Sequence, residues 1–450
     1  MQNFETFYFE GFEFDIGTGR ASFFYSFDKK EFFEEKIYFY DLNFEITRKN
    51  QELQEYETFL FSLSLALGVS YYKLFPTKKL IVETGFLDEY QKDFWKNFYI
   101  QGLGEFFYRN QLDYREYGNF ESIHQKKLQK KLQKNLQNKS LLPIGGGKDS
   151  IVSSEILEQN NKNYTPFIFG KRDIIKNAQL DILRKEALFI KRELSPNLFK
   201  LTKQGYYNGH IPISGIISFV SLFVAYLYDY KNIIFSNEKS ANIGNTFLGD
   251  LEVNHQYSKS IDFEEKLRKY IKNYISDEIE YFSLLRGWYE LKIASIFVEK
   301  GKKYFSSFSS CNANFKLNQT EKNQNLWCKS CPKCVFVYSI LRPFLTDEEN
   351  MQIFGEELYQ KEDLKNLFLE IWGWKDFKPF ECVGEEEEAR LATYLFLQKN
   401  PNFKADILEI FKEKIAQIGL NYFQDLQKKY FSFDENNFSG EEFKTILRNI

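Results

Sequence analysis

The residues whose types and spacing best suit chemistry form one segment, Pro143-Ile144-Gly145-Gly146-Gly147-Lys148-Asp149-Ser150. An apolar strand is expected just before it, over 141–144, and a helix just after it, over 149–158. Consecutive glycines between a strand and a helix leave backbone N–H groups open to an anion, and the helix N-terminus adds a favourable field. The segment therefore predicts a phosphate-binding loop.

This loop departs from the Walker A pattern, which requires G-x-x-x-x-G-K-[ST], because Asp149 separates Lys148 from Ser150. It resembles the S-G-G-x-D-S pyrophosphatase loop (PP-loop) of enzymes that split ATP into AMP and pyrophosphate. The match fails only at the first position, where Gly145 replaces serine and removes one hydroxyl contact to phosphate. A glycine-rich turn that merely caps the helix is the alternative.

Four of the five cysteines are clustered with the spacing C-x16-C-x2-C-x2-C, at Cys311, Cys328, Cys331 and Cys334. Four thiolates at such spacing suit a closed tetrahedral site for structural Zn²⁺. An iron–sulfur cluster, a redox-active pair and cysteines without a metal stay open as alternatives. The fifth, Cys382, fits either a small buried hydrophobe or a catalytic thiol.

Further polar candidates follow a strand expected over 232–235, in the segment 236–242 (SNEKSAN). Ligands of open parallel sheets bind at the carboxyl ends of strands, so Asn237 and Glu238 are placed to meet a substrate. A capped turn is the alternative. Among the three histidines, His210 precedes a long apolar segment and His255 lies in the polar stretch 253–260.

The first 120 residues predict an α+β region, with strands over 7–14 and 21–25 and helices over 52–67 and 88–99. After residue 141, strands alternate with helices, which indicates βαβ units and a parallel sheet. The expected strands are 141–144, 164–169, 189–194 and 232–235, and the expected helices are 149–158 and 174–186. Beyond about residue 262 the pattern is mostly helical outside the cysteine segment, and the acidic run 385–388 is expected to begin a helix.

We therefore expect an α/β protein with four parts. These are an N-terminal α+β accessory or substrate domain (1–120), a basic linker helix (121–140), an ATP-binding catalytic domain with the cysteine segment (141–345) and a helical C-terminal region (346–450). The basic stretch 122–140 lacks interleaved aromatic residues, which favours a solvated helix over a nucleic-acid patch.

Composition excludes several classes of protein. Hydrophobic residues make up 43% and charged residues 27%, which suits a packed core, and the net charge of −3 argues against a nucleic-acid-binding surface. The segment 211–228 carries no charge over eighteen residues, but Pro212 and Gly215 favour a buried helix over a membrane span. No signal peptide is evident. We expect a cytoplasmic protein without membrane insertion.

Across most of its length the chain resembles the UDP-N-acetyl-α-D-muramoyl-L-alanyl-L-glutamate epimerases of bacterial cell-wall synthesis. The stretches that carry the resemblance are Gly68–Lys73, Gly102–Asn110, Ile144–Ser150, Ser236–Asn242, Val253–Ser260, Trp327–Cys334 and Lys378–Gly384. The resemblance implies ATP- and Mg²⁺-dependent inversion of the terminal L-Glu of UDP-MurNAc-L-Ala-L-Glu, with AMP and pyrophosphate as by-products. It also implies a PP-loop core, like that of the adenine nucleotide alpha hydrolases, and coupling to a muramyl ligase that adds L-glutamate.

Under that resemblance, residue roles can be assigned as hypotheses. The backbone N–H groups from Gly145 through Gly146 and Gly147 to Ser150 would hold pyrophosphate, with Asp149 positioning Mg²⁺.

Lys148 would neutralise phosphate charge, and Asn237 and Glu238 would face the adenylate or the glutamate. For proton transfer at Cα we expect His255 and Cys382, with His210 and Glu381 as second choices.

Two other functions stay open. A nucleobase- or tRNA-modifying enzyme would keep the loop chemistry but transfer nitrogen or sulfur to an adenylated acceptor. A nucleotide sensor without catalytic activity would keep the fold alone. The first would release AMP in response to RNA or a heterocycle, and the second would bind ATP without turnover.

Overall fold

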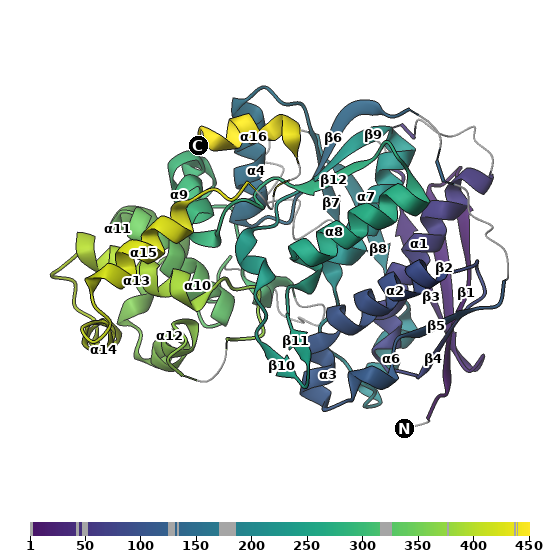
Figure 1. Cartoon of the computed structure of the whole chain (residues 1–450), viewed down its shortest axis with the longest axis horizontal. Coiled ribbons are helices and arrows are strands. Elements are labelled where there is room, and N and C mark those ends of the chain that lie inside the picture. The colour runs from purple at the N-terminus through teal and green to yellow at the C-terminus, as the bar shows by residue number, and fades with distance from the viewer. Residues whose placement is uncertain are drawn as a thin grey trace.

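The computed structural model describes residues 3–41, 45–46, 53–124, 131–132, 135–170, 186–315, 326–375, 378–435, 438 and 440–450. Its centre is a ten-stranded sheet with the order β12-β9-β6-β7-β8-β3-β2-β1-β4-β5 (Figure 1). The strands are β1 (Thr6–Asp15), β2 (Arg20–Phe27), β3 (Glu31–Tyr38), β4 (Lys79–Val82), β5 (Asn119–Ser122), β6 (Gln137–Pro143), β7 (Thr165–Phe169), β8 (Leu188–Glu193), β9 (Tyr230–Phe235) and β12 (Glu280–Ser283). β10 (Thr246–Leu248) and β11 (Leu251–Val253) form a separate hairpin.

Most neighbouring strands of the large sheet run parallel. The antiparallel pairs are β1–β2, β2–β3 and β3–β8. The pairing of β3 with β8 joins strands from the predicted N-terminal and ATP-binding regions, so both regions share one sheet. The expectation of an α/β fold with a largely parallel sheet is therefore confirmed.

Helices pack on both faces of the sheet around β6 and β9, and further helices follow along the chain. They are α1 (Leu53–Tyr72), α2 (Glu89–Gly102), α3 (Gly104–Asn110), α4 (Lys148–Gln159), α6 (Pro196–Lys203), α7 (Ile213–Tyr228), α8 (Ile261–Tyr270), α9 (Glu290–Lys300), α10 (Pro332–Leu341), α11 (Asp347–Phe354), α12 (Lys365–Ile371), α13 (Glu386–Lys399), α14 (Asp406–Ile415), α15 (Leu420–Phe431) and α16 (Glu441–Arg448). Figure 1 shows α1, α2, α7 and α8 over one part of the sheet and α10 to α15 gathered at the opposite end of the molecule, whereas α16 lies beside α4.

Alternation along the central strands divides the interior into two cores. Leu141 of β6 and Ile233 of β9 belong to a core with α1, α2 and α7, whereas Leu142 and Ile234 belong to a core with α4, α9 and α10. Successive strand residues point to opposite faces, and both faces here are covered by helices. This explains why the central strands are nearly continuous apolar runs.

Most predicted elements agree with the structure. Strands 7–14, 21–25, 164–169, 189–194 and 232–235 and helices 88–99 and 149–158 match to within a few residues, and α13 begins at the acidic run as expected. The apolar segment 211–228 forms the buried helix α7. Among the described residues, no helix combines the length and the apolar character needed to cross a membrane.

The predicted basic helix over 122–140 is wrong where the structure describes it. Residues 137–140 belong to β6, and Leu132 makes a parallel bridge to Ser276. Leucines at every fourth position indicate a helix, but the end of this stretch pairs with β9 and so belongs to the sheet. Part of the remaining stretch lies outside the described residues. The predicted helix 174–186 lies almost wholly outside them. β12 was also missed, in a region expected to be helical.

Candidate active site

The strands around β6 reverse their order at the site. β7 and β8 follow β6 on one side, whereas β9 and β12 lie on the other, so the chain switches direction between β6 and β9. Crevices at such switch points, beyond the carboxyl ends of the strands, are where doubly wound sheets bind ligands. The glycine loop follows β6 and the segment 236–238 follows β9, so both predicted segments meet at this point.

The glycine loop has the geometry of an anion-binding turn. Gly146 adopts φ +87°, and Gly147 is the N-cap of α4. A Cβ at Gly147 would lie 2.7 Å from Ser310 Oγ, whereas a Cβ at Gly145 would meet nothing within 4 Å. Glycine is therefore required at 146 for its conformation and at 147 for space, and serine would fit at 145.

The Lys148 side chain is buried and is not exposed to solvent at the glycine loop. Its ammonium group is fully buried and pairs with the carboxylates of Asp149 and Glu290, the first residue of α9. Burial opposes its charge, but the two carboxylates hold the pKa of Lys148 well above its usual range. Glu290 also lies 3.4 Å from Lys333 Nζ, and although burial acts in the other direction, these two ammonium groups lower its pKa to about 2. Lys148 would have to exchange a carboxylate partner to contact phosphate.

Glu238 has the features of a ligand-binding carboxylate. It is buried, and among the described residues its Oε1 atom has no hydrogen-bond partner. Burial raises the pKa of Glu238, and the negative charges of Glu290 and Asp149 raise it further, although the positive charge of Lys259 acts to lower it. A cation near Glu238 and Asp149 would relieve this repulsion, and carboxylate oxygens are the ligands that Mg²⁺ prefers. Asn237 is fixed nearby by a 3.1 Å bond from its Nδ2 to Ser283 Oγ.

A second cluster contains the predicted proton-transfer residues. His255 Nδ1 lies 2.5 Å from Glu105 Oε2, and the His255 ring hydrogen-bonds to Cys382. Glu105 is held in turn by Arg109, at 2.5 Å. The rings of His210 and His255 are tilted by 39° to each other, with centroids 4.0 Å apart.

The electrostatics of this cluster favour a charged pair. Burial lowers the pKa of His255, but its bonds to Cys382 and Glu105 raise it to about 9. Burial raises the pKa of Cys382, but the Lys259 ammonium and His255 together lower it to about 7. Between these values Cys382 is a thiolate and His255 an imidazolium. Burial and the charge of His255 keep the pKa of His210 well below its usual range, so that ring is neutral.

The β10–β11 hairpin brings these distant residues together. Asn245 Oδ1 accepts the His255 backbone N–H at 2.9 Å, and Asn245 Nδ2 donates to Pro379 O at 2.7 Å. Gln256 Nε2 donates to Val383 O at 3.0 Å. Both carbonyls flank Cys382 in sequence, so two side-chain amides fix the cysteine segment against the hairpin.

Lys259 connects the two clusters. Its ammonium group interacts electrostatically with Cys382 on one side and with Glu238, Asp149 and Glu290 on the other, and these charges raise its pKa despite its burial. Its Nζ atom lies 3.3 Å from Gln256 Oε1. A substrate that spans the glycine loop and Cys382 would therefore pass close to the half-buried Lys259 ammonium group.

The structure thus groups the predicted residues into one set around the glycine loop and a second set around His255 and Cys382. Glu381 lies beside Cys382 in the same segment, half-buried. Sequence reasoning missed Glu105, Lys259 and Glu290. Glu105 and Lys259 lie within stretches that carry the family resemblance, and that resemblance could have pointed to them. Glu290 lies in no motif.

Within the part of the chain that the structure describes, two groups of side chains have donors close enough to hold a metal ion. The four clustered cysteines form one, and their Sγ atoms lie within 4.8 Å of one another. Glu105, His210 and His255 form the other, with the same limit on their donor atoms. The second group overlaps the proton-transfer cluster, so a cation there would compete with the bond between Glu105 and His255.

Comparison with known proteins gives consistent results along the chain. The family model described as the MurL N-terminal domain matches residues 1–284, and that of the MurL C-terminal domain matches residues 307–424. A protein of Xanthomonas oryzae pv. oryzae named UDP-N-acetyl-alpha-D-muramoyl-L-alanyl-L-glutamate epimerase is 34% identical over 86% of this chain and 84% of its own length. A protein of the same name from Salinispora tropica is 32% identical over 88% of this chain and 85% of its own. On these matches, the chain belongs to the UDP-N-acetyl-α-D-muramoyl-L-alanyl-L-glutamate epimerase (MurL) family.

Proposed function

We propose that this protein inverts the terminal L-Glu of UDP-MurNAc-L-Ala-L-Glu to D-Glu, consuming ATP and water and releasing AMP and pyrophosphate. The observation that carries the proposal is the placement of a phosphate-type loop and a thiolate–imidazolium pair around one half-buried lysine, Lys259. The names of the relatives supply the substrate. Because that substrate ends in L-Glu, a ligase that adds L-glutamate must act before this enzyme.

ATP serves to make the Cα proton acidic. Cα next to a carboxylate resists deprotonation, because loss of the Cα proton would place a second negative charge beside that of the carboxylate. Attack of the α-carboxylate on the α-phosphorus of ATP forms an acyl-adenylate and releases pyrophosphate. The carbonyl then withdraws electrons from Cα, and hydrolysis after inversion returns the carboxylate and AMP.

On the nucleotide side, the backbone N–H groups of residues 145–150 would hold the pyrophosphate, in a core of the PP-loop type. The doubly wound strand order around β6 supports this placement. Asp149 and Glu238 would hold Mg²⁺, which supplies charge neutralisation at the phosphates when bound. Lys148 would add positive charge after leaving Glu290, and Asn237 would orient the nucleotide or the glutamate.

On the proton-transfer side, Cα would enter between Cys382 and His255 and replace their direct hydrogen bond. The Cys382 thiolate takes the Cα proton, and the His255 imidazolium delivers a proton to the opposite face. After product leaves, renewed contact lets the thiol return its proton to the imidazole, which restores the starting charges. Lys259 would stabilise the negative charge that develops on the carbonyl oxygen between the two steps.

The experiment that tests this function follows AMP and pyrophosphate release from ATP and Mg²⁺, with and without UDP-MurNAc-L-Ala-L-Glu, in D₂O. Chiral analysis and mass spectrometry of the glutamate accompany it. We expect AMP release that depends on the dipeptide substrate and D-Glu that carries one deuterium at Cα. AMP release without D-Glu, or none at all, would contradict the proposal and favour a nucleobase-modifying enzyme instead.

A further inference from the structure

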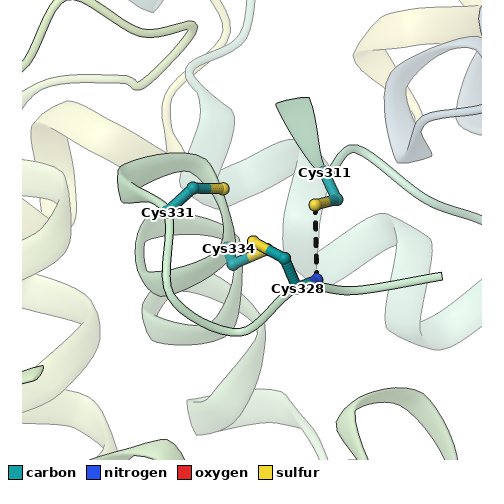
Figure 2. Close-up of side chains that lie close together, drawn as sticks. All are labelled: Cys311, Cys328, Cys331 and Cys334. Atoms are coloured by element: carbon teal, nitrogen blue, oxygen red, sulfur yellow. Dashed lines mark hydrogen bonds between the residues drawn. The ribbon is translucent and has the colours of Figure 1, made fainter. Parts of the chain in front are cut away.

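The four clustered cysteines have the spacing of a single tetrahedral ion. Their Sγ atoms lie within 4.8 Å of one another, and those of Cys328 and Cys334 are 3.7 Å apart (Figure 2). Tetrahedral Zn–S bonds of about 2.3 Å separate sulfurs by about 3.8 Å, whereas a disulfide needs about 2.05 Å. All four cysteines are free thiols. The geometry fits one Zn²⁺ and leaves no room between the sulfurs for a multi-iron cluster.

The surrounding backbone also suits thiolates at this site. The Cys328 N–H points to Cys311 Sγ at 3.3 Å, as Figure 2 shows, and Ser330 Oγ lies 3.6 Å from Cys328 Sγ. Such donors stabilise the charge on metal-bound sulfur and orient the ligands. Pro332 at the start of α10 fixes the turn between Cys331 and Cys334.

The chain just before Cys311 forms a wall of the glycine loop. Ser309 N donates to Gly146 O at 3.1 Å, and Ser310 Oγ occupies the space that a Cβ at Gly147 would take. Ser309 Oγ accepts the Cys311 N–H at 3.2 Å and reaches Leu326 O at 2.5 Å. The residues on both sides of the cysteine site are thereby tied to each other and to the loop.

A second connection runs through Lys333, which lies between the ligands Cys331 and Cys334. It is buried, and its Nζ atom is 3.4 Å from Glu290 Oε1. The other oxygen of Glu290 pairs with Lys148, the residue that follows the glycines. The cysteine site therefore contacts the loop both at its backbone and at its buried lysine.

We infer that Cys311, Cys328, Cys331 and Cys334 bind one Zn²⁺ that positions the glycine loop for nucleotide. Removal of the metal would release Ser309 and Lys333 together, so that Gly146 loses a backbone partner and Glu290 loses a cation. The nucleotide part of this inference rests on the proposed function, whereas the metal and the order of the loop do not depend on it.

The test uses the full-length protein without nucleotide or Mg²⁺, purified under reducing conditions. Metal content is measured by mass spectrometry for the wild type, for Cys331→Ser and for the control Cys382→Ser, which removes the one cysteine outside the site. Hydrogen exchange of amides 144–150 is compared before and after chelation of the wild type, and again after Zn²⁺ is restored. Binding of α,β-methylene-ATP with Mg²⁺ is then measured by calorimetry on zinc-loaded and zinc-free protein.

We expect one zinc per chain in the wild type and in Cys382→Ser, and little in Cys331→Ser. Chelation should speed exchange at 144–150 at least about tenfold and weaken analogue binding by a similar factor, with both reversed by Zn²⁺. Protein without zinc, or zinc removal that leaves exchange at 144–150 unchanged, would overturn the inference. Should Cys331→Ser not fold, the chelated wild type decides. Altered exchange in a protein that binds no analogue would support the positioning role and count against the proposed nucleotide chemistry alone.

Discussion

Glu105 Oε2 and His255 Nδ1 lie 2.5 Å apart although 150 residues separate them in the chain. A carboxylate on Nδ1 fixes the tautomer and the orientation of the ring, and leaves Nε2 available to another partner. We therefore expect Glu105 to position the His255 ring in an arrangement of carboxylate, imidazole and thiol.

Substituting Glu105→Gln should lower kcat by about 10- to 100-fold, because the imidazolium loses a charged partner. The decrease in kcat/KM at alkaline pH, the upper limb of the pH profile, should also move to lower pH, since loss of the carboxylate lowers the pKa of His255. Steady-state kinetics across pH measure both effects. The exposed Glu89→Gln serves as a matched control, and an unshifted upper limb in Glu105→Gln would contradict the positioning role.

The pH dependence of kcat/KM should be bell-shaped. The active form needs the Cys382 thiolate, which forms as pH rises through about 7, and the His255 imidazolium, which is lost as pH rises through about 9. The two apparent values belong to the pair and not to either residue alone. A rate that increases steadily from pH 6 to pH 10 would exclude imidazolium as the proton donor.

Replacing Cys382 with alanine should separate the two halves of the reaction. We expect D-Glu formation and deuterium exchange at Cα to fall by about 10²- to 10⁴-fold, because the thiolate is the proposed base. AMP release that depends on the dipeptide substrate should persist, since the glycine loop is untouched. Full-rate racemisation by Cys382→Ala would rule out this role.

Alanine substitutions at the three loop glycines should differ in their effects on stability and on nucleotide-analogue binding. Gly146→Ala forces an L-residue to φ +87° and should cost about 1–2 kcal/mol of stability. Gly147→Ala places its methyl group 2.7 Å from Ser310 Oγ and should weaken α,β-methylene-ATP binding. Gly145→Ala meets open space and is the control. Urea unfolding and calorimetry measure the series, and equal effects at all three positions would contradict this account of the loop.

Breaking the buried pair of Lys148 and Glu290 should destabilise the fold strongly. Lys148→Met leaves a buried carboxylate with Lys333 as its nearest remaining cation, and loss of a buried partner costs about 3–5 kcal/mol. Lys266→Met, which removes the partly exposed pair with Asp262, should cost less than about 1 kcal/mol. Urea denaturation compares them, and similar losses in both variants would contradict the structural role of Lys148.

How far the sequence predicts this protein depends on whether the signal is local. The strand–glycine–helix unit at β6 and α4 was predictable because glycine conformation and helix capping act over a few residues. β12 and the strand end at 137–140 were not, because their pairing with β9 is a tertiary interaction that local pattern does not encode.

The candidate site divides in the same way. His255 and Cys382 were proposed from their chemistry. Their contact, however, depends on hydrogen bonds from the side-chain amides of Asn245 and Gln256 to backbone carbonyls more than 120 residues away. Glu290 had no local signal at all, since a glutamate at a helix start is usually a solvated cap. Its burial between two lysines follows only from the packing of α9 against α4 and α10.

The pairing of β3 with β8 has a consequence for how this chain can be divided. A fragment that begins near residue 141 would expose the edge of β8 to solvent, and a fragment that ends near residue 120 would expose β3. Unpaired edges of this kind invite aggregation. The two fragments should therefore refold only when expressed together, as complementing halves of one cooperative unit.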